Sequence, residues 1–102
     1  INLPESAMNN PGLGWRVPQN GLTGAGAPGS AGGHCVSIAG YSQSELDVIT
    51  WGMRIPMTGE FWDAYVEECY ALLSPDFAAT VPDNATMYDL EQLQSDLKLV
   101  TA

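Results

Sequence analysis

Alternation of apolar and polar residues in the middle of the chain predicts a small antiparallel sheet. Residues His34–Ala39 alternate along the chain, as they do in a strand with one buried face. A short polar turn leads to a second alternating run, Leu46–Trp51, and two runs joined in this way indicate a hairpin. Two shorter strands are expected at Ile1–Leu3 and Met53–Ile55.

Further along, apolar residues recur at the three- and four-residue spacing of a helix. The main helix is expected from Thr58 to about Leu73, with Thr58 as its N-cap and Glu60 in its first turn. Its expected apolar side comprises Phe61, Tyr65, Cys69, Leu72 and Leu73. A second helix is expected at the C-terminal end, capped by Asp89 and running to about Val100.

These elements place the chain in the α+β class, as one domain with a small sheet packed on one main helix. The parts in chain order are a strand and a long loop (1–33), a hairpin (34–56) and a helical part (57–102). The loop is rich in Gly and Pro, with Trp15 as its expected anchor. A loop of this length is expected either to cover a site or to contact another chain. A third interpretation is that the glycine run is only a connecting segment without a function of its own.

The net negative charge of the chain limits the kinds of molecule that it is expected to bind. The net charge is −9, and only Arg16, Arg54 and Lys98 are positive. Such a surface repels nucleic acid and anionic membranes, so neither is an expected partner. No run is long enough to span a bilayer. A protein partner or a second copy of this chain is expected instead, bound through loop residues 9–33.

The candidate chemistry is centred on His34, the only histidine, which follows two glycines at the start of the first long strand. From its position alone, His34 is interpreted either as a general base or as a core residue that fills space. Cys35 and Cys69 are expected to be buried packing thiols. With one histidine and no Cys-x-x-Cys, the chain is expected to hold no metal and no cofactor.

Several short motifs occur in a familiar order. They are Gly33-His34-Cys35-Val36, Gly40-Tyr41 and Trp51-Gly52. This order resembles the C-terminal, histidine-bearing half of papain-like cysteine peptidases. More narrowly, the chain is similar to uncharacterised papain-like proteins of bacteria and phages. The segments that carry this similarity are Leu3-Pro4-Glu5-Ser6-Ala7, Pro28-Gly29-Ser30-Ala31-Gly32-Gly33-His34, Thr50-Trp51-Gly52 and Met57-Thr58-Gly59-Glu60-Phe61-Trp62.

The resemblance implies roles for particular residues. His34 takes the place of the catalytic histidine, and Trp51 matches the tryptophan that shields it. The family places an orienting Asn two residues before that tryptophan, where this chain has Ile49, so Thr50 or Asp47 is left as a stand-in. The family's nucleophilic cysteine begins a helix in the N-terminal half of the fold. This chain is therefore expected to be the C-terminal half of a papain-like half-barrel fold.

Three functional hypotheses follow. The first is a non-catalytic papain-like module with a structural or interaction role, in a phage or prophage particle. The second is the histidine-bearing half of an active cysteine peptidase or amidase, whose nucleophile lies on an upstream segment or a partner chain. The third is a small acidic binding domain unrelated to papain, with His34 as a core residue.

Overall fold

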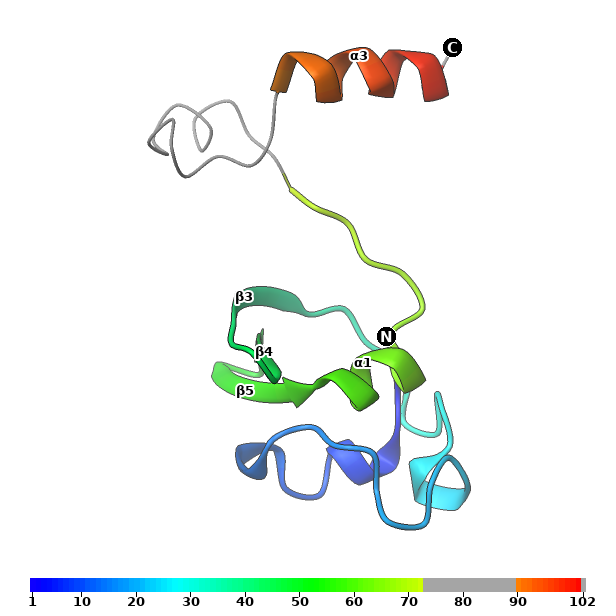
Figure 1. Cartoon of the computed structure of the whole chain (residues 1–102). Coiled ribbons are helices and arrows are strands. Elements are labelled where there is room, and N and C mark those ends of the chain that lie inside the picture. Colours follow the sequence, from blue (N-terminus) through cyan, green and yellow to red (C-terminus); the bar gives the residue numbers. More distant parts are fainter. Residues whose placement is uncertain (73–89, 102) are drawn as a thin grey trace. The chain divides into compact units, whose positions relative to one another are not determined.

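The computed structural model describes residues 1–72 and 90–101. The chain divides into two units, Ile1–Cys69 and Tyr70–Ala102, which are described separately (Figure 1). The described residues form a two-stranded sheet, a three-stranded sheet and two α-helices, so the predicted α+β class is confirmed.

The first unit is built on a three-stranded antiparallel sheet in the order β3-β4-β5 (Figure 1). Its strands are β3 (Ser37–Tyr41), β4 (Glu45–Thr50) and β5 (Met53–Thr58). The pair β3–β4 is the predicted hairpin, and β5 is longer than the short strand expected there. A bulge at Ala39 adds one residue to β3 opposite β4.

The segment around His34 forms a different structure from the one predicted. The strand β1 (Asn2–Leu3) pairs with β2 (Gly32–Gly33) in a separate two-stranded sheet. The predicted strand His34–Ala39 is therefore wrong at its beginning, because the backbone of His34 bonds to Ile1 rather than to β4. Pairing with β4 begins only at Ser37.

The core lies on one face of the three-stranded sheet. Val48 on β4 and Ile55 on β5 are fully buried and are paired in register, and the neighbouring Met57 is buried as well. Further buried residues of this core are Leu3, Ala7, Trp15, Phe61 and Tyr65. The opposite face is more open, with Ile49 exposed. The predicted alternation along β4 is thus confirmed, because alternate side chains of a strand point to opposite faces.

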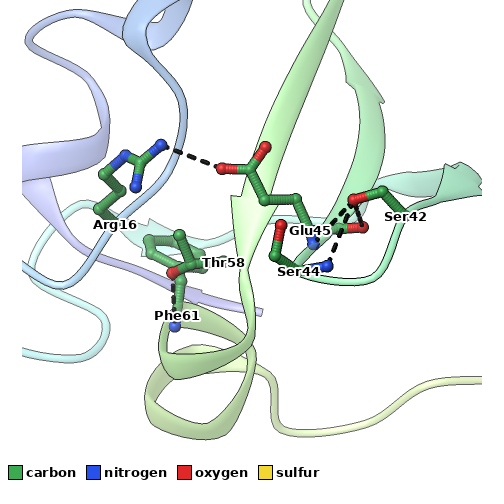
Figure 2. Close-up of polar contacts among 6 residues, drawn as sticks. All are labelled: Arg16, Ser42, Ser44, Glu45, Thr58 and Phe61. Carbon is green, nitrogen blue, oxygen red and sulfur yellow. Dashed lines mark hydrogen bonds and ion pairs between the residues drawn. The ribbon is translucent and has the colours of Figure 1, made fainter.

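The helix α1 (Gly59–Tyr65) covers this core. Thr58 caps it as predicted, because its hydroxyl oxygen accepts a hydrogen bond from the Phe61 backbone N–H at 3.2 Å (Figure 2). Phe61 and Tyr65 are one turn apart, and their ring centroids lie 4.5 Å from each other. Both rings are fully buried, and the partly buried Trp62 and Ala64 pack against the same core.

The prediction of a helix to Leu73 is wrong, because α1 ends at Tyr65 and Val66 is extended. The residues that would continue the apolar side are Cys69 and Leu72, and both are exposed. A short helix gains most of its stability from packing, so it ends where there is no core left to cover. Leu73 itself lies outside the described residues.

The long loop between β1 and β2 contains three 3-10 turns, η1 (Glu5–Ala7), η2 (Pro11–Leu13) and η3 (Gly24–Gly26). Trp15 anchors it as predicted: the Trp15 N–H donates to the Pro56 carbonyl at 2.7 Å, and the Trp15 carbonyl accepts from Thr58 N–H at 3.1 Å. The loop therefore adds a single bridge along the outer edge of β5.

The second unit contains the helix α3 (Leu90–Thr101), which agrees with the expected C-terminal helix. The predicted cap Asp89 lies outside the described residues. None of the helices in the described ranges combines the length and the apolar character that crossing a membrane requires.

Candidate functional site

His34 is held by its backbone where β2 ends. Its N–H donates to the Ile1 carbonyl at 2.9 Å, and its own carbonyl accepts from the Ile1 nitrogen at 2.8 Å. The side chain is half-buried. A histidine with a fixed backbone and a partly exposed ring is able to exchange protons with a bound reactant.

The imidazole is oriented by Thr50, which lies on β4. His34 Nε2 and Thr50 Oγ1 are 2.7 Å apart, a hydrogen-bond distance whose direction depends on the imidazole tautomer. Thr50 is buried on the core side of the sheet, with 9% of its surface exposed. A hydroxyl group both donates and accepts, so Thr50 suits the neutral and the protonated imidazole.

The other ring nitrogen, Nδ1, is in a different situation. Among the described residues no hydrogen bond reaches Nδ1, and it is not one of the buried polar atoms left without a partner. His34 Nδ1 therefore keeps some accessible surface and has no protein partner among the described residues, while Nε2 is hydrogen-bonded to Thr50. This is the arrangement that a general base requires, because one nitrogen is fixed and the other is available to a reactant.

Trp51 packs against the imidazole at the turn between β4 and β5. The ring centroids of Trp51 and His34 lie 5.0 Å apart with 24° between the planes, a stacked arrangement. Trp51 and Gly52 both have positive φ, 49° and 70°, as a two-residue type I′ turn requires. A bulky residue in this left-handed region is strained, and such strain accumulates at functional sites.

The structure thus brings together all three residues singled out from the sequence: His34, Thr50 and Trp51. One neighbour was not foreseen, since Trp15 was expected only as a loop anchor. Its ring meets Trp51 edge-on, with the centroids 5.8 Å apart. Trp15 is 36 positions before Trp51, and no local pattern in the sequence pairs two aromatic residues across such a distance.

The two cysteines are placed differently from the prediction. Both Cys35 and Cys69 are exposed thiols, so the expectation of buried packing cysteines is wrong. Cys35 lies in the irregular segment between β2 and β3, where its thiol faces solvent. Cys69 is exposed because α1 ends before reaching it.

Ile49, at the family's orienting position, is exposed on the far face of the sheet from Thr50. Asp47, the other proposed stand-in, forms an ion pair with Arg54 and not with His34. The hydrogen bond and the charge of Asp47 raise the pKa of Arg54 above its ordinary value. Among the residues of the first unit, Thr50 therefore has the orienting position alone.

The remaining polar features lie elsewhere in the first unit. Arg16 pairs with Glu45 at 3.0 Å, and the Ser42 hydroxyl closes the β3–β4 turn by accepting from two backbone N–H groups (Figure 2). Beside this turn is an open hollow of about 200 Å³, lined by Ser42, Gln43, Ser44, Glu45, Leu46 and Gly59. No group of three or more potential metal ligands occurs within residues 1–72 and 90–101.

Comparison with known proteins finds no matching protein family, no matching curated protein and no matching solved structure. The papain-like resemblance therefore depends on the motifs in the sequence. The geometry around His34 is independent of that resemblance.

Proposed function

We propose that this chain supplies the histidine side of a cysteine peptidase or amidase site, with His34 as the general base. The observation that carries the proposal is the arrangement of the imidazole, with Nε2 held by Thr50 at 2.7 Å and Nδ1 not fully buried and without a hydrogen-bond partner among the described residues. Trp51 stacks on one face of the imidazole ring, with the ring centroids 5.0 Å apart.

In this proposal, His34 Nδ1 accepts the proton of a thiol, and the resulting thiolate attacks the carbonyl carbon of an amide. The protonated imidazole then returns the proton to the leaving amine, and water hydrolyses the thioester that remains. Thr50 accepts from Nε2–H while the ring is positively charged. These steps require a thiol on the Nδ1 side of the imidazole.

Cys35 and Cys69 do not meet this requirement. Both thiols are exposed, and neither is hydrogen-bonded to the His34 ring in the described part of the chain; Cys69 follows α1 in an irregular segment. The single hydrogen bond to the His34 ring in the described part of the chain comes from Thr50. This sequence has no other cysteine, so we assign the nucleophile to a segment beyond this sequence or to a partner chain.

The test uses the protein expressed from its complete natural gene, together with any chain that co-purifies. An electrophilic thiol probe is added at neutral pH, and the labelled cysteine is identified by peptide mass spectrometry. His34→Gln keeps the size of the side chain and removes the base, so it should slow the labelling of one cysteine other than Cys35 and Cys69. Thr23→Val, which changes an exposed loop hydroxyl, is the matched control. Labelling rates that are equal in the two variants at every cysteine would exclude the catalytic proposal.

A second candidate function is a non-catalytic interaction module, such as a structural protein of a phage or prophage particle. The supporting observation is the exposure of large apolar side chains on the loop, Leu13 at 72% and Leu22 at 46%. In this case a second copy of the chain covers the loop. Replacing both leucines with serine should then dissociate the oligomer in sedimentation velocity, whereas His34→Gln should not. A wild-type chain that sediments as a monomer would exclude self-association through this loop.

A further inference from the structure

Five aromatic rings form a continuous series from the candidate site to the glycine-rich loop, and we call this series the aromatic ladder. Its members are His34, Trp51, Trp15, Phe61 and Tyr65. Successive ring centroids lie 5.0, 5.8, 5.3 and 4.5 Å apart, within the range of direct aromatic contact. At its far end, the Tyr65 hydroxyl donates to the Gly26 carbonyl at 2.7 Å.

Trp15 is the central member of the ladder, and its burial has a free-energy cost. Its ring is 1% exposed, and its indole N–H is buried with no acceptor among the described residues. Burying an N–H donor without an acceptor costs the free energy of its hydration, and no hydrogen bond compensates for this cost. A phenyl ring has no such donor. The Trp15 indole stacks on Phe61 and also meets Trp51 edge-on. This reach is what distinguishes Trp15 from a smaller core residue.

Trp15, Phe61 and Tyr65 are held in place by β5 and α1. The backbone of Trp15 is bonded on both sides to β5, at Pro56 and Thr58, and α1 begins directly after Thr58. Phe61 and Tyr65 project from the first two turns of α1. Packed cores transmit displacement because they have little free volume. A displacement of Tyr65 is therefore expected to reach Trp51 through Phe61 and Trp15.

We propose that Trp15 and Tyr65 are positioning residues for His34. Acting through Trp51, they make the orientation of the imidazole depend on how the glycine-rich loop is bound by Tyr65. The loop is then a control element for the site rather than slack between β1 and β2. The catalytic meaning of this coupling rests on the proposed function, whereas the coupling itself is measured on the imidazole without any assay of activity.

The test is nitrogen and carbon NMR of the isotopically labelled full chain. Tyr65→Phe keeps the ring and removes the hydrogen bond to Gly26, and Trp15→Phe shortens the ladder in its centre. Both variants should shift the His34 ring nitrogen signals, which report the tautomer, together with the Trp51 indole signal. Thr23→Val is the control, because it removes a hydrogen bond within the same loop, to the Asn20 carbonyl, without touching the ladder.

The outcomes separate this inference from the proposed function. Loop signals that move in Tyr65→Phe while the His34 ring signals stay as in Thr23→Val would overturn the coupling and leave the role of His34 intact. Coupling that is observed while His34→Gln does not affect thiol labelling would retain the inference and exclude the catalytic function. If Trp15→Phe does not fold, Tyr65→Phe decides the question alone, since it preserves every ring of the ladder.

Discussion

Replacing Gly26 with alanine should destabilise the first unit by a simple steric route. A Cβ atom at this position would lie 2.1 Å from the Gly21 carbonyl oxygen and 2.7 Å from Pro18 Cγ. Ordinary contact begins at 3.4 Å, so the Gly21 and Gly26 peptides would have to move apart. Overpacking of this kind costs about 1–3 kcal/mol. The displaced Gly26 carbonyl would also lose the Tyr65 hydroxyl, at a further cost of about 1 kcal/mol.

The combined loss of about 2–4 kcal/mol is a large part of the 5–15 kcal/mol that is typical of small domains. Urea unfolding followed by tryptophan fluorescence measures it, since Trp15 is buried in the core. In a thermal scan, each kcal/mol should lower Tm by about 4–8 °C.

Gly12→Ala is the matched control for this experiment. It also lies in a 3-10 turn of the loop, but its added Cβ meets no atom within 4 Å. We expect Gly12→Ala to leave the free energy of unfolding unchanged within about 0.5 kcal/mol. Equal stabilities of the two variants would refute the reasoning, because they would show that the Gly26 contact is not present in solution.

Two further predictions concern Trp51 and Tyr65, the second and the last members of the aromatic ladder. Trp51→Asn should change the free energy of unfolding by less than about 1 kcal/mol in urea titrations, because relief of the strained φ offsets the lost aromatic contacts. Burial raises the pKa of Tyr65 above its ordinary 10.0. The unfolded state therefore ionises first, and the wild type should lose stability relative to Tyr65→Phe as the pH rises through and above 10. Unfolding curves of both proteins at pH 8 and above pH 10 test this, and parallel losses would contradict it.

The parts of the fold that were predicted correctly are those encoded by local patterns. Alternation in the sequence identified the hairpin and the buried side of β4, and a Thr followed by an acidic first turn identified the start of α1. These signals operate over a few residues, and the structure preserves them because each also satisfies the core.

The errors occurred where a distant contact decides the outcome. Periodicity continues from Tyr65 to Cys69 and Leu72, but the helix stops because there is no core surface beside those residues. The backbone of His34 pairs with Ile1, 33 positions away, which delays the strand that its own side-chain pattern predicts. In both places the local sequence preference did not decide the structure. It was decided by whether packing surface or backbone hydrogen-bond partners lay nearby.

The candidate site shows the same division between local and distant information. Short motifs identified His34, Thr50 and Trp51 as a group, and the structure places them in contact. The contact of Trp15 with the candidate site could not be predicted from the sequence, because it depends on a bridge between the loop and β5. The exposure of Cys35 was also unforeseen, because Cys35 precedes the strand β3 in which the sequence pattern placed it.

The choice between Ile49 and Thr50 as the orienting position follows from the register of β4. Ile49 is opposite Arg54 and Ser37 on the exposed face, so its side chain points away from the His34 ring. The papain-like pattern would place an orienting amide at position 49, but in this register an amide there would face solvent. We therefore expect Ile49→Asn to leave the His34 ring nitrogen signals unchanged, and to alter stability by about 0.5 kcal/mol or less.

Thr50→Val is the complementary change, since it keeps the shape of the side chain and removes the hydroxyl. His34 Nε2 then loses its partner 2.7 Å away, at a cost of about 0.5–1.5 kcal/mol, and the ring nitrogen signals should shift toward those of an unrestrained tautomer mixture. Thr50→Ser keeps the hydroxyl and should retain the wild-type signals. If instead Ile49→Asn moved the signals and Thr50→Val did not, the strand would be out of register by one residue, because a shift of one position exchanges the two faces. The same pair of variants therefore tests the orienting role of Thr50 and the register of β4 on which it depends.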